Sequence, residues 1–334
     1  MSKLRIGVLC GVFDPVHHAL LRPAYQALDS GSLDQVLVFP LDVPGMSSDP
    51  EDRWKMLVAA CCSDPHLIPV RPSSVAGHTD VLSLLRSQYP DARLSMLPQE
   101  QVDRLSDAVR RDLVSGTLPD GMSIPVLEYI RAKGLYGVPS RIPASGIWLD
   151  RLFASLKPRR FAHSLAVADT ARCMAVRFGE DPFKAEEAGL LHDCAKNLPL
   201  ADMQRIAREN GITDDPVFLE SAALLHSAVG AFVASHDYGM TDPDVLEAIS
   251  YHNTGHAGMS RLAMCVCLSD SIEPTRRTYP RLEQVRSLAA VSLEKALLLS
   301  LEGTAHFVMD KGLPLHPRTQ ETIAWLKTLP AVRE

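Results

Sequence analysis

The sequence has few of the features that mark secreted, membrane-spanning or nucleic-acid-binding proteins. Its seven cysteines form no C-x-x-C pair, and an odd number of scattered cysteines is typical of reduced thiols rather than a disulfide framework. The net charge of -6 provides no basic surface for sequence-independent nucleic-acid binding. No apolar run is long enough to span a membrane, and the first residues contain no small-residue cleavage site. We therefore expect a cytoplasmic protein with no membrane segment and no nucleic-acid partner.

The sequence does contain enough apolar material for two domains. It has 334 residues, of which 46% are hydrophobic, and this length and composition support two ordinary cores. Short apolar runs alternate with helical segments in the first half, whereas the second half is one helical segment after another. Residues 139–146 carry two prolines and no periodic apolar pattern, as in a linker. The sequence predicts domains over 1–138 and 147–330, joined by a linker over 139–146.

The first half predicts an α/β domain with a Rossmann-like parallel sheet. A strand buried on both faces is expected over residues 4–10, further strands over 36–40, 67–70 and 92–96, and helices up to about residue 28 and over 54–62 and 80–88. Strand, helix, strand units of this kind are parallel and right-handed. Pro69 lies inside the third strand and suits an edge position. A ligand site is expected at the carboxyl ends of the strands, beside residues 11–17.

The turn after the first strand contains Gly11, Phe13, Asp14, Pro15 and His17. It resembles the signature G-x-F-D-P-x-H-x-G-H of the nicotinate-mononucleotide adenylyltransferases, and the resemblance covers roughly the first 136 residues. It implies a nucleotidyltransferase fold. The nucleotide-binding positions that the resemblance retains are Gly11, Phe13, Asp14, His17 and Arg110.

Departures from that family predict a degenerate domain. Leu20 stands where the family has its second histidine, and the S-T-x-I-R motif that binds ATP phosphates survives only as residues 106–110. Within that motif Asp107 would repel an anion. Losing a potential cation and gaining a carboxylate weakens the electrostatic support of phosphoryl transfer. We expect the fold without the reaction. The alternatives are a bifunctional protein that is still an adenylyltransferase of NAD biosynthesis, and a non-catalytic nucleotide sensor or assembly surface.

The second half predicts an all-α domain that contains an ordered series of histidines and acids. Each lies beside apolar residues of a predicted helix, in the order His163, His192, Asp193, His226, His252 and Asp270. For any one histidine, a hydrogen-bonded place in the core is the simpler explanation. Burying six such groups without a shared partner is far too costly. Four imidazoles and two carboxylates can hold two transition-metal ions, with Asp193 bridging them.

This order, H…HD…H…H…D, resembles the HD-domain metallophosphohydrolases. The surrounding residues are similar to the symmetrical bis(5'-nucleosyl)-tetraphosphatases in the stretches 160–163, 192–196, 224–230, 251–255, 258–260, 268–274, 276–277 and 315–317. The resemblance implies two ions, with iron preferred and manganese or zinc also suitable. It implies cleavage of the dinucleoside polyphosphate diadenosine tetraphosphate to two ADP by a metal-bridged hydroxide.

By position, the resemblance also implies a ligand set for each ion. One ion would take His163, His192, Asp193 and Asp270, and the other would take Asp193, His226 and His252. The substrate could instead be another nucleotide phosphate ester, because HD domains share ligands across substrates.

Several neighbouring residues are candidates for contact with substrate. Lys196 lies one helical turn after His192 and is predicted to bind phosphate, with a solvated lysine as the alternative. Arg276 and Arg277 are predicted to clamp the polyphosphate, and these three complete a catalytic set with Asp193. Residues 253–255 (Asn253, Thr254 and Gly255) directly follow a predicted ligand and are expected to bind substrate. The oligomeric state is open, with a homodimer among the options.

Overall fold

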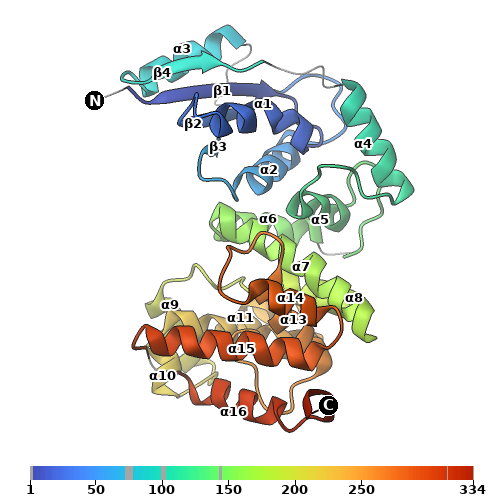
Figure 1. The fold of residues 1–334 in the computed structure, drawn as a ribbon, viewed down its shortest axis with the longest axis vertical. Helices are drawn as coiled ribbons and strands as arrows, with labels where there is room; N and C mark the ends of the chain where they lie inside the picture. The colour runs from blue at the N-terminus through green and yellow to red at the C-terminus, as the bar shows by residue number, and fades with distance from the viewer. Residues whose placement is uncertain (1–2, 72–77, 99–102, 143–144, 314, 334) are drawn as a thin grey trace. The chain divides into compact units, whose positions relative to one another are not determined.

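The structure is a computed structural model of the chain. It describes residues 3–71, 78–98, 103–142, 145–313 and 315–333. The chain divides into two compact units, Met1–Leu149 and Asp150–Glu334 (Figure 1). The division falls inside helix α6 (Ser145–Ser155), so the last two residues of the predicted linker are helical. Among the described residues no helix is both long and apolar enough to cross a membrane.

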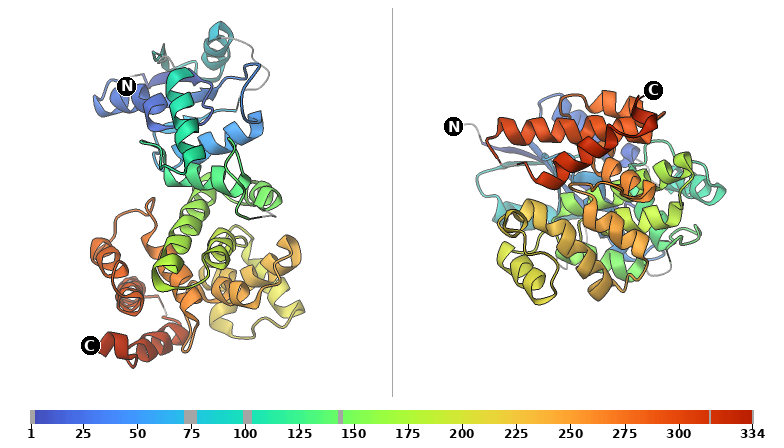
Figure 2. Two further views of the ribbon diagram at one scale, coloured as in Figure 1. Left: turned by 90° about the vertical axis from the view of Figure 1, so that its right-hand side faces the viewer. Right: turned by 90° about the horizontal axis from the view of Figure 1, so that it is seen from below.

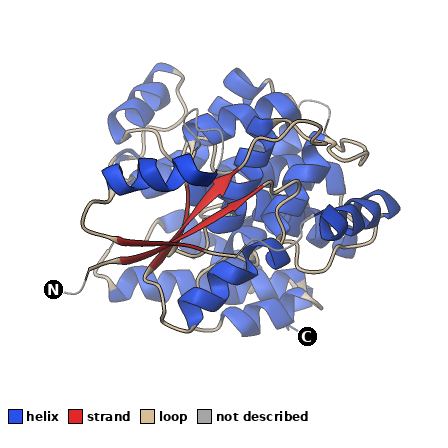
Figure 3. Cartoon of the chain, turned by 90° about the horizontal axis from the view of Figure 1, so that it is seen from above, coloured by secondary structure: helices blue, strands red, loops and turns tan. Residues whose placement is uncertain are grey.

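The first unit contains a four-stranded parallel sheet in the order β3-β2-β1-β4 (Figure 3). Its strands are β1 (Arg5–Gly11), β2 (Gln35–Pro40), β3 (Leu67–Pro69) and β4 (Arg93–Met96). In the central pair, Ile6 lies opposite Gln35 and Gly11 opposite Pro40. The strand β3 lies at an edge, as Pro69 predicts, because an edge strand tolerates a missing N–H donor. The predicted α/β class of this unit is confirmed.

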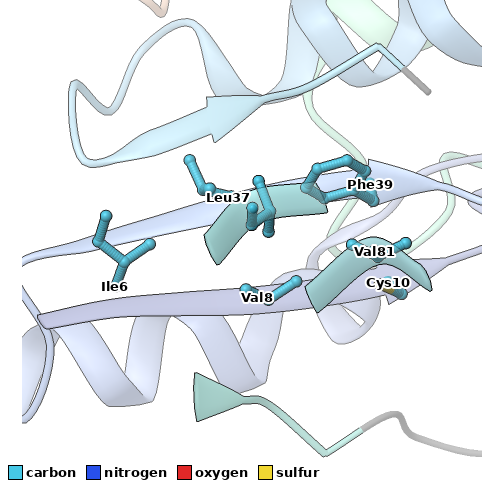
Figure 4. Close-up of a cluster of buried hydrophobic side chains, with 7 residues drawn as sticks. Ile6, Val8, Cys10, Leu37, Phe39 and Val81 are labelled. Atoms are coloured by element: carbon cyan, nitrogen blue, oxygen red, sulfur yellow. The ribbon is translucent and has the colours of Figure 1, made fainter. Parts of the chain in front are cut away.

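Helices and apolar strand residues form the core of this unit. The helices are α1 (His18–Asp29), α2 (Pro50–Cys61), α3 (His78–Gln88), α4 (Asp103–Ser115) and α5 (Ile124–Lys133). Side chains of β1 and β2 pack against Val81 and Leu85 of α3 (Figure 4). The central strands β1 and β2 are buried on both faces, as expected of a parallel sheet, whereas the edge strand β4 is largely exposed. The helices α4 and α5 lie outside the elements predicted from the sequence.

The second unit is helical, as predicted. After α6 it contains α7 (Pro158–Phe178), α8 (Pro182–Leu191), α9 (Leu200–Glu209), α10 (Pro216–Leu219), α11 (Ala222–Tyr238), α12 (Pro243–Tyr251), α13 (Arg261–Ile272), α14 (Leu282–Ala289), α15 (Leu293–Asp310), α16 (Pro317–Leu326) and α17 (Pro330–Arg333). Residues 290–292 separate α14 from α15. In this unit α13 contacts α7, α8, α12 and α15. Figure 2 shows the helices of the unit from two further sides.

Recurring start signals fix several of these helices. Asp181, Asp215 and Asp242 each cap a helix by accepting hydrogen bonds from its first backbone N–H groups. In each case proline follows at the first helical position, where its missing donor costs nothing. These caps set where α8 and α12 begin, and both helices end directly before a predicted metal ligand.

Candidate metal centre

All six predicted metal ligands lie together in the second unit. His163 is on α7, His226 on α11 and Asp270 on α13. The pair at 192–193 directly follows α8, and His252 directly follows α12. The residues of this group are buried, apart from the partly exposed Asp270. Five helices therefore bring side chains that are remote along the chain to one place.

One kind of contact orients the four imidazoles. In each ring Nδ1 lies against an oxygen: Gly189 O at 2.7 Å from His192, Ile249 O at 2.8 Å from His252, Ala222 O at 3.3 Å from His226, and Glu273 Oε1 at 2.9 Å from His163. A carbonyl or carboxylate oxygen can only accept, so Nδ1 carries the proton and donates. The lone pair of each neutral ring is then on Nε2, which is the atom left for a metal.

Asp193 lies between two groups of these nitrogen atoms. Its Oδ2 is 3.3 Å from His192 Nε2 and 3.9 Å from His163 Nε2. Its Oδ1 is 3.1 Å from His226 Nε2 and 3.7 Å from His252 Nε2. One carboxylate thus faces two separate sets of ligands, which is the arrangement that a bridging ligand requires.

The donors fit divalent ions. His163, His192 and Asp270 offer one set of converging ligand atoms, and His192, Asp193 and His252 offer another. His163 Nε2, His192 Nε2 and Asp193 Oδ1 are buried atoms without a hydrogen-bond partner among the described residues. Buried polar atoms are normally satisfied, so three orphaned atoms at one point indicate a missing partner that accepts lone pairs. Divalent cations have that property.

Charge within the site also suits a cation. Burial alone would raise the pKa of Asp193, but the neighbouring His192 and His226 outweigh burial and hold that pKa well below its usual range. Burial, followed by the proximity of His192 and His226, lowers the pKa of His252 well below its usual value. At neutral pH the centre therefore presents an ionised carboxylate and a neutral imidazole, which are the forms that bind metal.

A pocket of about 390 Å³ opens beside this centre. Lys196, Arg276 and Arg277, all predicted to contact substrate, line it. Lys196 Nζ is 3.0 Å from His226 Nε2, so Lys196 is not merely a solvated residue at a helix end. Arg276 Nη1 is 3.4 Å from Asp270 Oδ1. Three predicted phosphate-binding residues thus share one pocket.

Two site residues were missed by the sequence analysis. Arg160 Nη1 donates to Asp193 Oδ2 at 2.6 Å, and Glu273 accepts from His163 Nδ1. Arg160 precedes His163 by three residues, so helical spacing alone could have placed both on one face of α7. Glu273 follows Asp270 by three residues in the same way. Helical spacing shows which residues share a face, but not which distant residue that face meets.

The residues expected to bind substrate after His252 have internal partners instead. Asn253 Nδ2 donates to Ala223 O at 2.6 Å, and the buried Thr254 accepts from Thr322 Oγ1 through its carbonyl at 3.2 Å. Gly255 has a φ of 61°, and a Cβ there would lie 2.6 Å from Thr322. These residues hold the loop after α12 and are not among the residues that line the pocket. Their role in substrate binding stays a prediction.

The residues of the first unit that were predicted to bind nucleotide form hydrogen bonds with one another and with their neighbours. Asp14 Oδ1 accepts from Tyr136 Oη at 2.7 Å and from Ser48 Oγ at 2.5 Å. Arg110 donates to the Asp14 carbonyl at 2.5 Å and to Asp107 Oδ1 at 2.5 Å. Asp107 therefore neutralises the cation that would otherwise face a phosphate.

The three other predicted nucleotide-binding positions are Gly11, Phe13 and His17. Phe13 is buried with a φ of 51°, and a Cβ at Gly11 would lie 2.9 Å from its ring. His17 is buried, and burial, with a smaller effect of His18, lowers its pKa to about 4. His17 lines a pocket of about 280 Å³ with His18 and Tyr25, and no lysine or arginine is among the described residues that line it. Nucleotide binding by these positions stays a prediction.

Comparison with known proteins agrees with the geometry of the second unit. Residues 160–275 match the HD domain family. A symmetrical bis(5'-nucleosyl)-tetraphosphatase of Bacillus subtilis (strain 168) is 39% identical over 174 residues, which is 51% of this chain and 91% of that protein. A crystal structure of a predicted HD superfamily hydrolase involved in NAD metabolism, from Clostridium acetobutylicum, has a TM-score of 0.53 and 39% identity. It covers 54% of this chain and 95% of that one.

The fold and the clustered ligands define the second unit as an HD-domain hydrolase that can hold divalent metal. More narrowly, the chain belongs to the family of symmetrical bis(5'-nucleosyl)-tetraphosphatases. It is also similar to a two-function relative of Mycoplasma genitalium (strain ATCC 33530 / DSM 19775 / NCTC 10195 / G37), named "Probable nicotinate-nucleotide adenylyltransferase/Ap4A hydrolase". That relative is 32% identical over 193 residues, or 56% of this chain and 51% of the relative. Its name combines the two activities that the sequence resemblances imply.

Proposed function

We propose that this chain hydrolyses dinucleoside polyphosphates in a metal-dependent reaction, cleaving diadenosine tetraphosphate symmetrically to two ADP. The observation that carries the proposal is the position of Asp193, whose two oxygens face two separate sets of imidazole nitrogens. A carboxylate in that position suits a two-metal site, and two-metal sites are common in enzymes that cleave phosphate esters.

We propose that the ligands serve two ions in the two sets that the family resemblance implies. One ion would be held by Asp193 with His163, His192 and Asp270, and the other by Asp193 with His226 and His252. When bound, two such ions lower the pKa of a water molecule and neutralise charge on the phosphoryl oxygens. We propose iron on the family resemblance, because manganese and zinc suit the same nitrogen and oxygen donors.

The cationic side chains beside the centre would position the substrate. Lys196 Nζ lies 3.6 Å from Asp193 Oδ1, and Arg276 lies beside Asp270. From these positions an ammonium and a guanidinium can hold phosphate oxygens and orient the reacting phosphorus. Arg277 lines the same pocket and would bind the ADP that leaves.

Metal analysis and product identification test the proposal together. The purified full-length protein should contain a stoichiometric transition metal and convert diadenosine tetraphosphate to two ADP. Formation of ATP plus AMP would contradict symmetrical cleavage. If diadenosine tetraphosphate stays intact while another nucleotide is hydrolysed, the substrate assignment is wrong but the metal-dependent hydrolase remains.

Substitution of single ligands tests the site. His192→Ala and Asp193→Ala should each lose bound metal and reduce turnover to background, because each removes a buried donor to the centre. The matched control is His306→Ala, because His306 is exposed on α15 and distant in sequence from every predicted ligand. Normal metal content and turnover in either ligand variant would remove the proposed centre.

A further inference from the structure

The pocket beside the metal centre is lined by polar and charged side chains. Of the described residues that line it, none has an aliphatic or benzenoid side chain, and one, Glu273, carries negative charge. Its six cationic residues are Lys157, Arg159, Arg160, Lys196, Arg276 and Arg277. A nucleobase site is normally rich in apolar and aromatic contacts, whereas clustered guanidinium and ammonium groups bind phosphate.

Three of these cations face the carboxylates of the metal centre and form an inner set. Arg160 Nη1 is 2.6 Å from Asp193 Oδ2, and Lys196 Nζ is 3.6 Å from Asp193 Oδ1. Arg276 Nη1 is 3.4 Å from Asp270 Oδ1. The inner set is half-buried, and its charge is already opposed by ligands of the centre.

The other three cations form an outer set that lacks this compensation. Lys157, Arg159 and Arg277 are exposed, and within the described ranges none has an ion-pair partner. Glu273 does not neutralise them, because its carboxylate accepts from His163 Nδ1 and from the backbone N–H and hydroxyl of Thr275. Three unpaired positive charges in one pocket repel one another, so binding of a polyanion there relieves that repulsion.

We infer that the outer set selects substrates by their number of phosphates. The inner set and the centre hold the phosphate that reacts, and the outer set binds phosphates further along the same chain. A linear polyphosphate of three or more phosphates reaches both sets, whereas pyrophosphate reaches the inner set alone. The ligand class is a linear polyphosphate, with or without nucleosides at its ends. The inference rests on the proposed function in one respect, because the metal centre marks the inner end of the pocket.

Binding of inorganic polyphosphates to the full-length protein tests this inference without turnover. Tripolyphosphate and pyrophosphate are titrated by calorimetry, with the metal content checked before and after. The wild-type protein should bind tripolyphosphate more tightly than pyrophosphate. The double variant Arg159→Ala/Arg277→Ala should lose about tenfold in affinity for tripolyphosphate, as expected for two exposed ionic contacts. Its affinity for pyrophosphate should change less than about twofold on the same scale.

The matched control is Arg205→Ala, because Arg205 is exposed on α9, pairs with Glu209 and lies outside the pocket. It should leave both affinities unchanged. Equal losses for the two probes, or no loss for tripolyphosphate, would overturn the inference. A protein with the expected binding pattern that leaves diadenosine tetraphosphate intact would refute only the proposed substrate. A protein that cleaves this substrate but binds both probes equally would refute only the selection by phosphate number.

Discussion

A single buried carboxylate orients the histidine on α7. Three of the four site imidazoles donate from Nδ1 to backbone carbonyls of their own helices, whereas His163 donates to the side chain of Glu273. Glu273 is the residue that caps the carboxyl end of α13, and it is 110 positions from His163 in the sequence. It is therefore the one of these four partners that a substitution can remove, and we regard it as a positioning residue.

Glu273→Ala should lower metal affinity about 10- to 100-fold, the usual effect of removing the partner of a metal-binding histidine. Glu273→Gln should lose less, because its amide oxygen still accepts from Nδ1. Competition with a chelator followed by metal analysis measures both, and circular dichroism checks that the helices are retained. Glu283→Ala, on the exposed side of α14, is the control. Unchanged metal affinity in Glu273→Ala would mean that His163 is oriented by packing alone.

Much of the centre could be predicted at the residue scale. The ligand identities follow from chemistry, because six ionisable groups in apolar helices need a common partner. Lys196 could be placed at the site because it follows His192 by four residues, although residues 192–197 form turns and not the expected helix. The contact of Arg160 with Asp193 could not be predicted, since it joins residues of different helices and depends on how those helices cross. For Asn253, whose place next to a ligand suggested substrate contact, the amide donates to the Ala223 carbonyl, and substrate contact stays a prediction.

At the scale of elements, the close packing of α7 and α8 brings His163 and His192 together. Gly189 on α8 makes this possible, because a Cβ there would lie 2.8 Å from Ala168 Cα and 3.0 Å from Val167 O of α7. Both atoms belong to backbone and cannot move aside as a flexible side chain would. The same Gly189 accepts from His192 through its carbonyl. Any separation of the two helices therefore reaches the centre directly.

Gly189→Ala should reduce the free energy of unfolding by about 1–3 kcal/mol, as overpacking usually does, and should also weaken metal binding. Gly303→Ala on α15 is the matched control, because nothing lies within 4 Å of the added Cβ. It should be neutral or stabilising by about 0.4–1 kcal/mol. Urea unfolding followed by circular dichroism compares the two variants. Equal stability of both would show that α7 and α8 can move apart freely.

The sequence was most informative where helices carry a cap and a clear period. Asp181 caps α8 and Pro182 begins it, and this pair is a helix start that can be recognised in the sequence. The helix α4 was missed although apolar residues recur at four-residue spacing in 105–113, a pattern that indicates a helix. The helix α10 spans only four residues, which is too short for any period to be recognised.

At the scale of the whole molecule, the two units differ in how their characteristic motifs are used. In the second unit the matching residues converge and leave lone pairs without partners. In the first unit Arg110 donates a hydrogen bond to Asp14, and Asp14 also accepts hydrogen bonds from Ser48 and Tyr136. The motif around Asp14 thus links segments of the first unit, and a nucleotide would have to compete with these hydrogen bonds.

The chain should form no dinucleotide from ATP and nicotinate mononucleotide, because Leu20 stands in place of a family histidine and Asp107 pairs with Arg110, and both changes weaken the electrostatic support for a triphosphate. The same preparation should still hydrolyse diadenosine tetraphosphate, which serves as the internal control for active protein. Chromatography of both reactions makes the comparison. Formation of nicotinic acid adenine dinucleotide at a rate comparable to the hydrolysis of diadenosine tetraphosphate would instead establish a bifunctional enzyme.

The Nδ1 contacts of the four histidines have a consequence for how the protein acquires its ions. Three of these rings are oriented by hydrogen bonds to carbonyls one turn earlier in the chain, so the metal site is formed by the folded chain without its ions. A chelator should remove metal from such a site and leave the chain folded. A zinc finger, by contrast, depends on its ion for folding. Which ion occupies the metal site then depends on which transition metals are available in the cell.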